Sequence, residues 1–120
     1  MERYGVVKML KFDFGSSLKD LKVVDSLRDA LKLFVKYVQE LVDDPDVEIE
    51  QIYTYSVHDL DPPSVTRLKS LVKKEDALRC LHCAVIYVCD RSLQTCYEVE
   101  IAIVKELEYG VLDKIMSRMF

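Results

Sequence analysis

The chain has 120 residues, half of them hydrophobic and 32% charged, with a formal net charge of −4 and an isoelectric point near 5.2. This length predicts a single domain over residues 1–120, with a hydrophobic core large enough to fold without a stabilising disulfide or metal ion. Because the balance is acidic and the sequence has no block of basic residues, its charge does not favour non-specific binding to nucleic acids.

The amino-acid usage also bears on the compartment. The longest apolar run is far shorter than the roughly 20 residues that cross a bilayer, and the first residues lack the pattern of a signal peptide. Asn is absent and Gln occurs three times, whereas charged residues are abundant. Depletion of these thermolabile amides is typical of thermophile proteins. We therefore expect a cytoplasmic protein of thermophile-like composition that does not enter the membrane.

The first predicted element is a strand over Tyr4–Phe14, which is rich in β-branched and aromatic residues. The small residues Gly15, Ser16 and Ser17 end it. Residues 17–24 fit either a short helix or a connector, and the sequence does not choose between them.

A long helix follows. Ser26 is a good helix cap, and Asp29 three residues later complements the positive end of the helix. The helix ends ahead of Pro45, because residues before a proline avoid helical backbone angles. Its predicted apolar stripe consists of Leu27, Ala30, Leu31, Phe34, Val38 and Leu41.

The middle of the chain predicts a second strand and a second helix. Val47–Val57 alternates for most of its length, and the proline-containing linker 58–63 follows it. Ser64 is the expected cap of a helix that continues to about Arg79.

The strongest pattern is a β-hairpin over residues 83–109. Residues 83–89 are apolar at every position, and residues 97–109 alternate between apolar and polar side chains. With Cys89 opposite Cys96, one face of the hairpin is apolar. The other face carries Val85 and Tyr87 beside a row of glutamates that we expect to be solvated, namely Glu98, Glu100, Glu106 and Glu108. The six side chains of the apolar face are Ala84, Ile86, Val88, Tyr97, Val99 and Ile101.

These elements predict an α+β or mixed α/β domain in the order β-α-β-α-β-β-α. The sheet has about four strands, with two main helices and a short C-terminal helix over residues 111–120. Right-handed crossovers through the two main helices make the first three strands parallel. The last strand is the expected sheet edge, and therefore a dimer-forming element.

The four cysteines and His82 lie close together in the sequence. Cys80 and Cys83 have the two-residue gap of a zinc knuckle, but Cys83 and Cys89 are roughly 20 Å apart in an extended strand at about 3.3 Å per residue. We therefore expect no metal site, and buried thiols are the favoured interpretation. A disulfide between the opposed Cys89 and Cys96 is an open alternative that the interior of a hyperthermophile tolerates.

Acidic residues are the candidate catalytic groups. The segment YVCDRSLQTCYEVEIA, with Asp90, Glu98 and Glu100, resembles the hairpin that holds Mg²⁺ in nucleases of the PD-(D/E)XK class. Here His82 and Cys83 stand where that family has Pro-Asp, and Glu100 stands where a Lys is usual.

Thr95 to Ala102 suggests a different family for the same residues. Thr95, Cys96, Tyr97 and Glu98 resemble the turn and helix start that carry the catalytic Glu of nucleoside deoxyribosyltransferases and TIR-like domains. This resemblance places Glu98 in the first turn of a helix at a ligand site. Alternation through Tyr109 favours a strand over that helix.

The remaining polar residues complete no catalytic set. His58 and Asp59 could form a base with its orienting carboxylate, although a surface histidine at a strand end is the usual outcome. With three glycines the chain offers no glycine-rich phosphate loop, so we expect no cofactor. The sequence thus favours a protein that acts by association, as a homodimer. The alternative is a nucleotide- or nucleic-acid-directed enzyme that uses Glu98, with Asp90 or Glu100 assisting.

Overall fold

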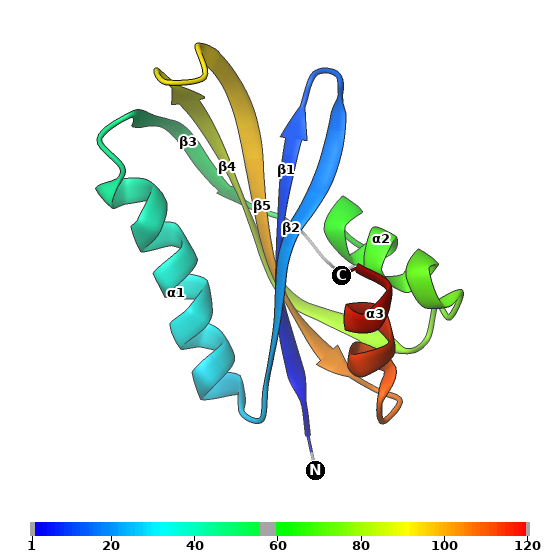
Figure 1. Ribbon diagram of the computed structural model, residues 1–120. Helices are drawn as coiled ribbons and strands as arrows, with labels where there is room; N and C mark the ends of the chain where they lie inside the picture. Colours follow the sequence, from blue (N-terminus) through cyan, green and yellow to red (C-terminus); the bar gives the residue numbers. More distant parts are fainter. Residues whose placement is uncertain (1, 56–59, 120) are drawn as a thin grey trace.

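The structure is a computed structural model that describes residues 2–55 and 60–119, and the described chain forms five strands and three helices (Figure 1). The elements are β1 (Tyr4–Phe12), β2 (Gly15–Val24), α1 (Leu27–Asp43), β3 (Val47–Thr54), α2 (Pro63–Val72), β4 (Leu78–Asp90), β5 (Thr95–Glu106) and α3 (Val111–Met119).

The strands form one antiparallel sheet in the order β2-β1-β5-β4-β3. The α+β class is confirmed. The element order is roughly as predicted, with five strands instead of about four, because residues 15–24 return as β2 beside β1. The parallel arrangement of the first three predicted strands is wrong, because all neighbouring strands are antiparallel. Strand β2 is hard to recognise because Lys19 is an extra, unpaired residue between the pairs Lys8–Asp20 and Met9–Leu18. The bulge breaks the alternation and places Leu18 and Leu21 on one face.

The hairpin register is confirmed. Cys89 lies opposite Cys96, and Val88, Ile86 and Ala84 lie opposite Tyr97, Val99 and Ile101. The position of β5 differs from the prediction, because β5 pairs with β1 on one side and β4 on the other. It is the central strand, and the sheet edges are β2 and β3.

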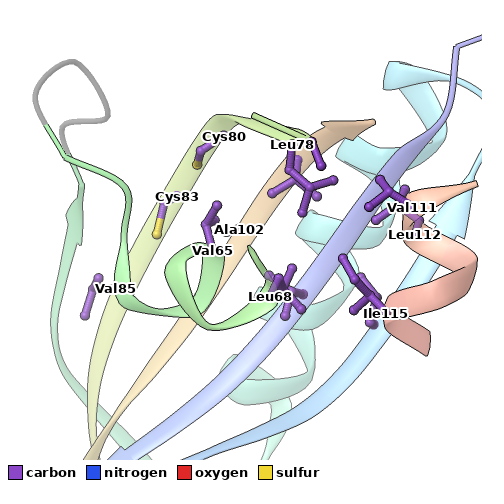
Figure 2. Close-up of a cluster of buried hydrophobic side chains, with 14 residues drawn as sticks. Val65, Leu68, Leu78, Cys80, Cys83, Val85, Ala102, Val111, Leu112 and Ile115 are labelled. Atoms are coloured by element: carbon purple, nitrogen blue, oxygen red, sulfur yellow. The ribbon is translucent and has the colours of Figure 1, made fainter. Parts of the chain in front are cut away.

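Helices cover both faces of the sheet, with α1 on one face and α2 and α3 on the other (Figure 1). The α1-facing core includes Ile86, Val88, Val99 and Ile101. Figure 2 shows the opposite core, in which residues of α2, α3, β4 and β5 meet, among them Leu68, Leu112 and Leu78. Both faces of β5 are therefore covered along much of the strand.

The helix boundaries follow local signals. Ser26 caps α1 as predicted, accepting a hydrogen bond from the Asp29 amide at 3.1 Å. Ser64 does not cap α2, because the extended backbone that precedes the helix is at Pro62 and Ser64 lies inside the first turn. The second helix is shorter than predicted. It ends at Val72 because Lys73 adopts a left-handed conformation with φ of 54°.

The cysteines divide into two pairs. Cys89 and Cys96 form a disulfide across the hairpin, with Cα atoms 4.0 Å apart. Cys80 and Cys83 are free and buried beneath α2 and α3, as expected of thiols acting as small apolar groups. Burial raises the pKa of the Cys80 thiol to about 11 and raises that of Cys83 further. Both thiols are therefore protonated and unreactive at neutral pH.

Candidate functional site

Asp90 ends β4 and organises the hairpin loop. Its carboxylate accepts hydrogen bonds from the Ser92 amide at 2.9 Å, the Ser92 hydroxyl at 2.7 Å and the Leu93 amide at 3.2 Å. The hydroxyl of Tyr97 lies 3.4 Å from its other oxygen. These bonds, that of the Ser92 hydroxyl first, lower the pKa of Asp90. The carboxylate thus has a complete structural role in the turn.

Glu100 lies on the opposite face of the sheet, beneath the start of α2. It is 5% exposed, and its carboxylate accepts a hydrogen bond from the Ser64 amide at 2.6 Å. Pro62 at the N-cap provides no side-chain bond to the helix, so Glu100 from the sheet serves in its place. The negative charge at this position also complements the helix dipole.

Glu98 shares the face of Glu100 and is half-buried. Its nearest polar partner is the hydroxyl of Tyr53 on β3, at 3.4 Å. Burial, and then the charge of Glu98, raises the pKa of the Tyr53 hydroxyl. Of the three predicted acids, Glu98 therefore has the weakest structural role.

The structure does not bring the three acids together. Asp90 follows the parity of Ile86 and Val88 and belongs to the α1 side, whereas Glu98 and Glu100 face the α2 side. Glu98 lies on β5 and not in a helix, so the helix start implied by the transferase and TIR resemblance is absent at this segment. His58 and Asp59 lie outside the described residues.

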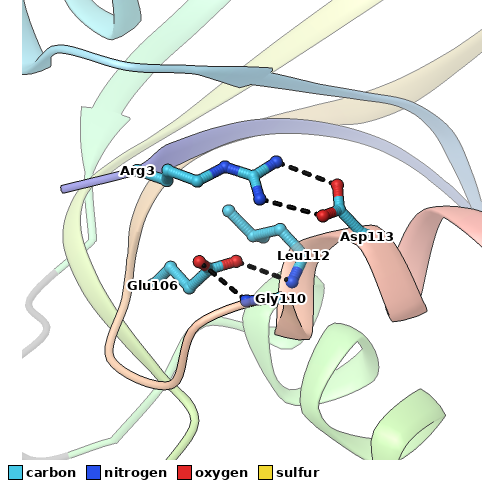
Figure 3. Close-up of polar contacts among 5 residues, drawn as sticks. All are labelled: Arg3, Glu106, Gly110, Leu112 and Asp113. Atoms are coloured by element: carbon cyan, nitrogen blue, oxygen red, sulfur yellow. Dashed lines mark hydrogen bonds and ion pairs between the residues drawn. The ribbon is translucent and has the colours of Figure 1, made fainter. Parts of the chain in front are cut away.

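The predicted row of solvated glutamates is wrong at two positions, because β5 is central and α2 and α3 cover this face. Glu100 caps α2, and Glu106 accepts hydrogen bonds from the amides of Gly110 and Leu112 at 3.1 and 2.9 Å (Figure 3). Beside it, the Arg3 guanidinium donates two bonds to the Asp113 carboxylate at 2.9 and 2.8 Å (Figure 3). These interactions of Glu100, Glu106 and Asp113 hold α2 and α3 against the sheet.

The packing of α1 leaves one side of the helix open. The hydroxyl of Tyr37 donates to Asp20 on β2 at 2.5 Å, and the Tyr37 ring lies 5.8 Å from the Lys8 ammonium on β1. Phe34 instead contacts the ring of His82 on β4, with centroids 4.9 Å apart. One side of the helix therefore faces β1 and β2, and the other faces β4 and the edge strand β3.

Four apolar side chains on that second side are exposed, and we call them the α1 flank. Two of them, Leu27 and Leu31, were expected in the core, but the α1 residues that the sheet buries fully are Ala30, Tyr37 and Leu41, with Leu33, Phe34 and Val38 partly buried. The signal in the sequence was the width of the apolar surface, which spans roughly 200° of the circumference at 3.6 residues per turn, more than one sheet face can cover. The exposed fractions are Leu27 41%, Leu31 46%, Val35 61% and Val42 55%.

Comparison with known proteins adds no information to the geometry described above. No family model, curated protein or solved structure matches the chain. Among the residues that the structure describes, no helix has the length and apolar character to span a membrane.

Proposed function

We propose that the protein acts through protein–protein association and forms a homodimer through the α1 flank. The observation that carries the proposal is the exposure of four aliphatic side chains in a row along one regular helix. Single exposed apolar residues are common on protein surfaces and need no explanation. A contiguous apolar row bordered by charged residues is typical of an interaction site.

A second copy is the partner that the charges of α1 favour. Among the exposed residues, Arg28, Lys32 and the acid Asp29 give the first half of the helix a net positive charge, Lys36 lies next to its midpoint, and Glu40 and Asp43 make its end acidic. A surface with opposite charges at its two ends complements itself when the second copy is reversed. The net charge of −4 and the mixed signs on α1 do not favour a nucleic-acid partner.

The proposal places the protein in the cytoplasm of a thermophile. A disulfide is unusual in the cytosol of mesophiles, but intracellular proteins of hyperthermophiles are rich in them. The absence of Asn supports a thermophile source, and the Cys89–Cys96 bond is compatible with the cytoplasm of such a source.

The test compares two leucines of similar exposure. Leu31→Lys places a charge in the centre of the α1 flank and is expected to weaken dimerisation roughly tenfold or more. Leu93→Lys alters a leucine of comparable exposure, 57% against 46% for Leu31, in the hairpin loop and is the control. Sedimentation equilibrium measures both. Equal dimerisation of the two variants, each folded by circular dichroism, would remove the α1 flank from the interface.

The second candidate is a nucleotide- or nucleic-acid-directed enzyme that uses Glu98. It is supported by the half-buried Glu98 carboxylate beside the Tyr53 hydroxyl, on a face that it shares with Glu100. Thermal shifts with Mg²⁺, Mn²⁺, Zn²⁺ and nucleotides test it. A ligand-induced shift that Glu98→Gln abolishes in a folded variant supports this candidate, and the absence of any shift counts against it.

A further inference from the structure

We infer that two copies pair their α1 helices antiparallel about a two-fold axis, with their β3 edges on the same side as the contact. This inference rests on the proposed homodimer and specifies its geometry. It predicts which residues of the two copies meet, and an experiment can disprove this geometry without disproving the dimer.

The apolar row of α1 is close to symmetric about its midpoint. Val38, which is partly buried, continues the α1 flank between Val35 and Val42. When the row is reversed onto itself, Leu27 lies opposite Val42 and Leu31 lies opposite Val38, with Val35 close to the two-fold axis. The row extends about 22 Å at 1.5 Å per residue, so the two ends cannot meet each other in the same copy.

The charges along the solvent-facing border of this row also favour antiparallel pairing. At helical spacing, Arg28 and Lys32 border its first half, and Gln39 and Asp43 border its second half. A two-fold axis perpendicular to both helices brings the same border of each copy together in opposite directions. Arg28 then lies near Asp43 of the second copy, and Lys32 lies near its Gln39. A parallel pair about a two-fold axis would instead place the solvent-facing borders of the two copies on opposite sides of the helix pair, so that Arg28 of one copy could not approach Asp43 of the other.

The position of the sheet relative to the α1 flank sets the direction of the two-fold axis. Because the α1 flank points sideways, toward the β3 edge, the two-fold axis runs through the sheet layer and both sheets lie on one side of the helix pair. Ile52 on β3, 54% exposed, pairs with Ile86 and therefore faces this same layer. Glu48, Glu50 and the bulge between Ile49 and Gln51 oppose direct pairing of the two β3 strands. The helices, not a continuous sheet, thus make the contact.

Cysteine cross-linking tests the direction of pairing. Leu27→Cys and Val42→Cys are prepared with tags of different mass, and each is oxidised mildly alone and in a pre-equilibrated mixture. Wild type is a suitable background, because Cys89 and Cys96 are bonded to each other and the other two cysteines are buried. We expect cross-linked dimers between the two variants in the mixture and none from either alone, whereas Val35→Cys cross-links to itself.

Other outcomes overturn the inference in distinguishable ways. Self-cross-linking of Leu27→Cys would show a parallel pair. No cross-link in the mixture, with a dimer still present by sedimentation, would show that another surface pairs the copies. A monomer in every sample would instead reject the proposed function itself. As an independent measurement, Arg28→Asp should weaken dimerisation roughly fivefold, and adding Asp43→Arg in the same chain should restore it. Failure of that rescue also contradicts antiparallel pairing.

Discussion

Replacing Glu100 tests whether this buried carboxylate is a structural cap of α2. Glu100→Ala removes the acceptor of the Ser64 amide, and Ser64 is fully buried in the wild-type protein. An unsatisfied buried donor costs about 1–3 kcal/mol, and the lost charge at the helix start adds about 0.3–1 kcal/mol. We expect a total loss of about 2–3 kcal/mol in the free energy of unfolding.

Urea denaturation of the oxidised protein measures this loss. With a dependence of about 2 kcal/mol per molar urea, the midpoint of Glu100→Ala should fall by about 1–1.5 M. Glu100→Gln keeps an acceptor oxygen and should lose only about 1 kcal/mol. Glu98→Ala, on the same strand and face, is the control and should change stability by about 0.5 kcal/mol or less. Equal midpoints for Glu100→Ala and Glu98→Ala would refute the capping role.

Three further predictions concern other interactions that stabilise the fold. Glu106→Ala should cost about 1–2 kcal/mol and speed amide exchange in α3, because Gly110 and Leu112 lose their shared acceptor; unchanged exchange would contradict this. Reducing the Cys89–Cys96 bond, which joins residues seven apart, should lower the free energy of unfolding by about 2.4 kcal/mol, because the unfolded chain gains loop entropy. An unchanged Tm after reduction would contradict this prediction. The Arg3 guanidinium holds the pKa of Asp113 below its usual value of 3.8, so the stability from this pair is present at neutral pH and is lost as the pH falls below that value. Asp113→Asn should therefore be less sensitive to acid than wild type in the same range, and an identical acid transition would count against the pair.

The sequence was informative where patterns are local. The register from Cys89–Cys96 to Ala84–Ile101 followed from alternation and from the length of the polar loop, and the Ser26 cap followed from a single residue. The central position of β5 could not be found this way, because it depends on pairing with β1, which is far away in sequence. A long alternating strand fits an edge equally well until its second partner is known.

The errors at the candidate site have the same origin. Glu100 and Glu106 occupy polar positions that suit a solvated face, and alternation alone cannot reveal helices packed over them. Once α2 and α3 cover that face, each glutamate is retained because a helix start needs an acceptor. The two exposed leucines of α1, Leu27 and Leu31, are the reverse case. They were assigned to the core because the sequence shows an apolar surface but not what covers it.

The most direct test of the account is the molar mass of the wild-type protein by light scattering over a dilution series. One chain has a mass of 13.9 kDa. We expect wild type to have about twice that mass at high concentration and to fall toward the single-chain mass on dilution. We expect Leu31→Lys to have the single-chain mass already at concentrations where wild type is still a dimer. A folded wild-type protein that stays at the single-chain mass throughout the series would contradict the account.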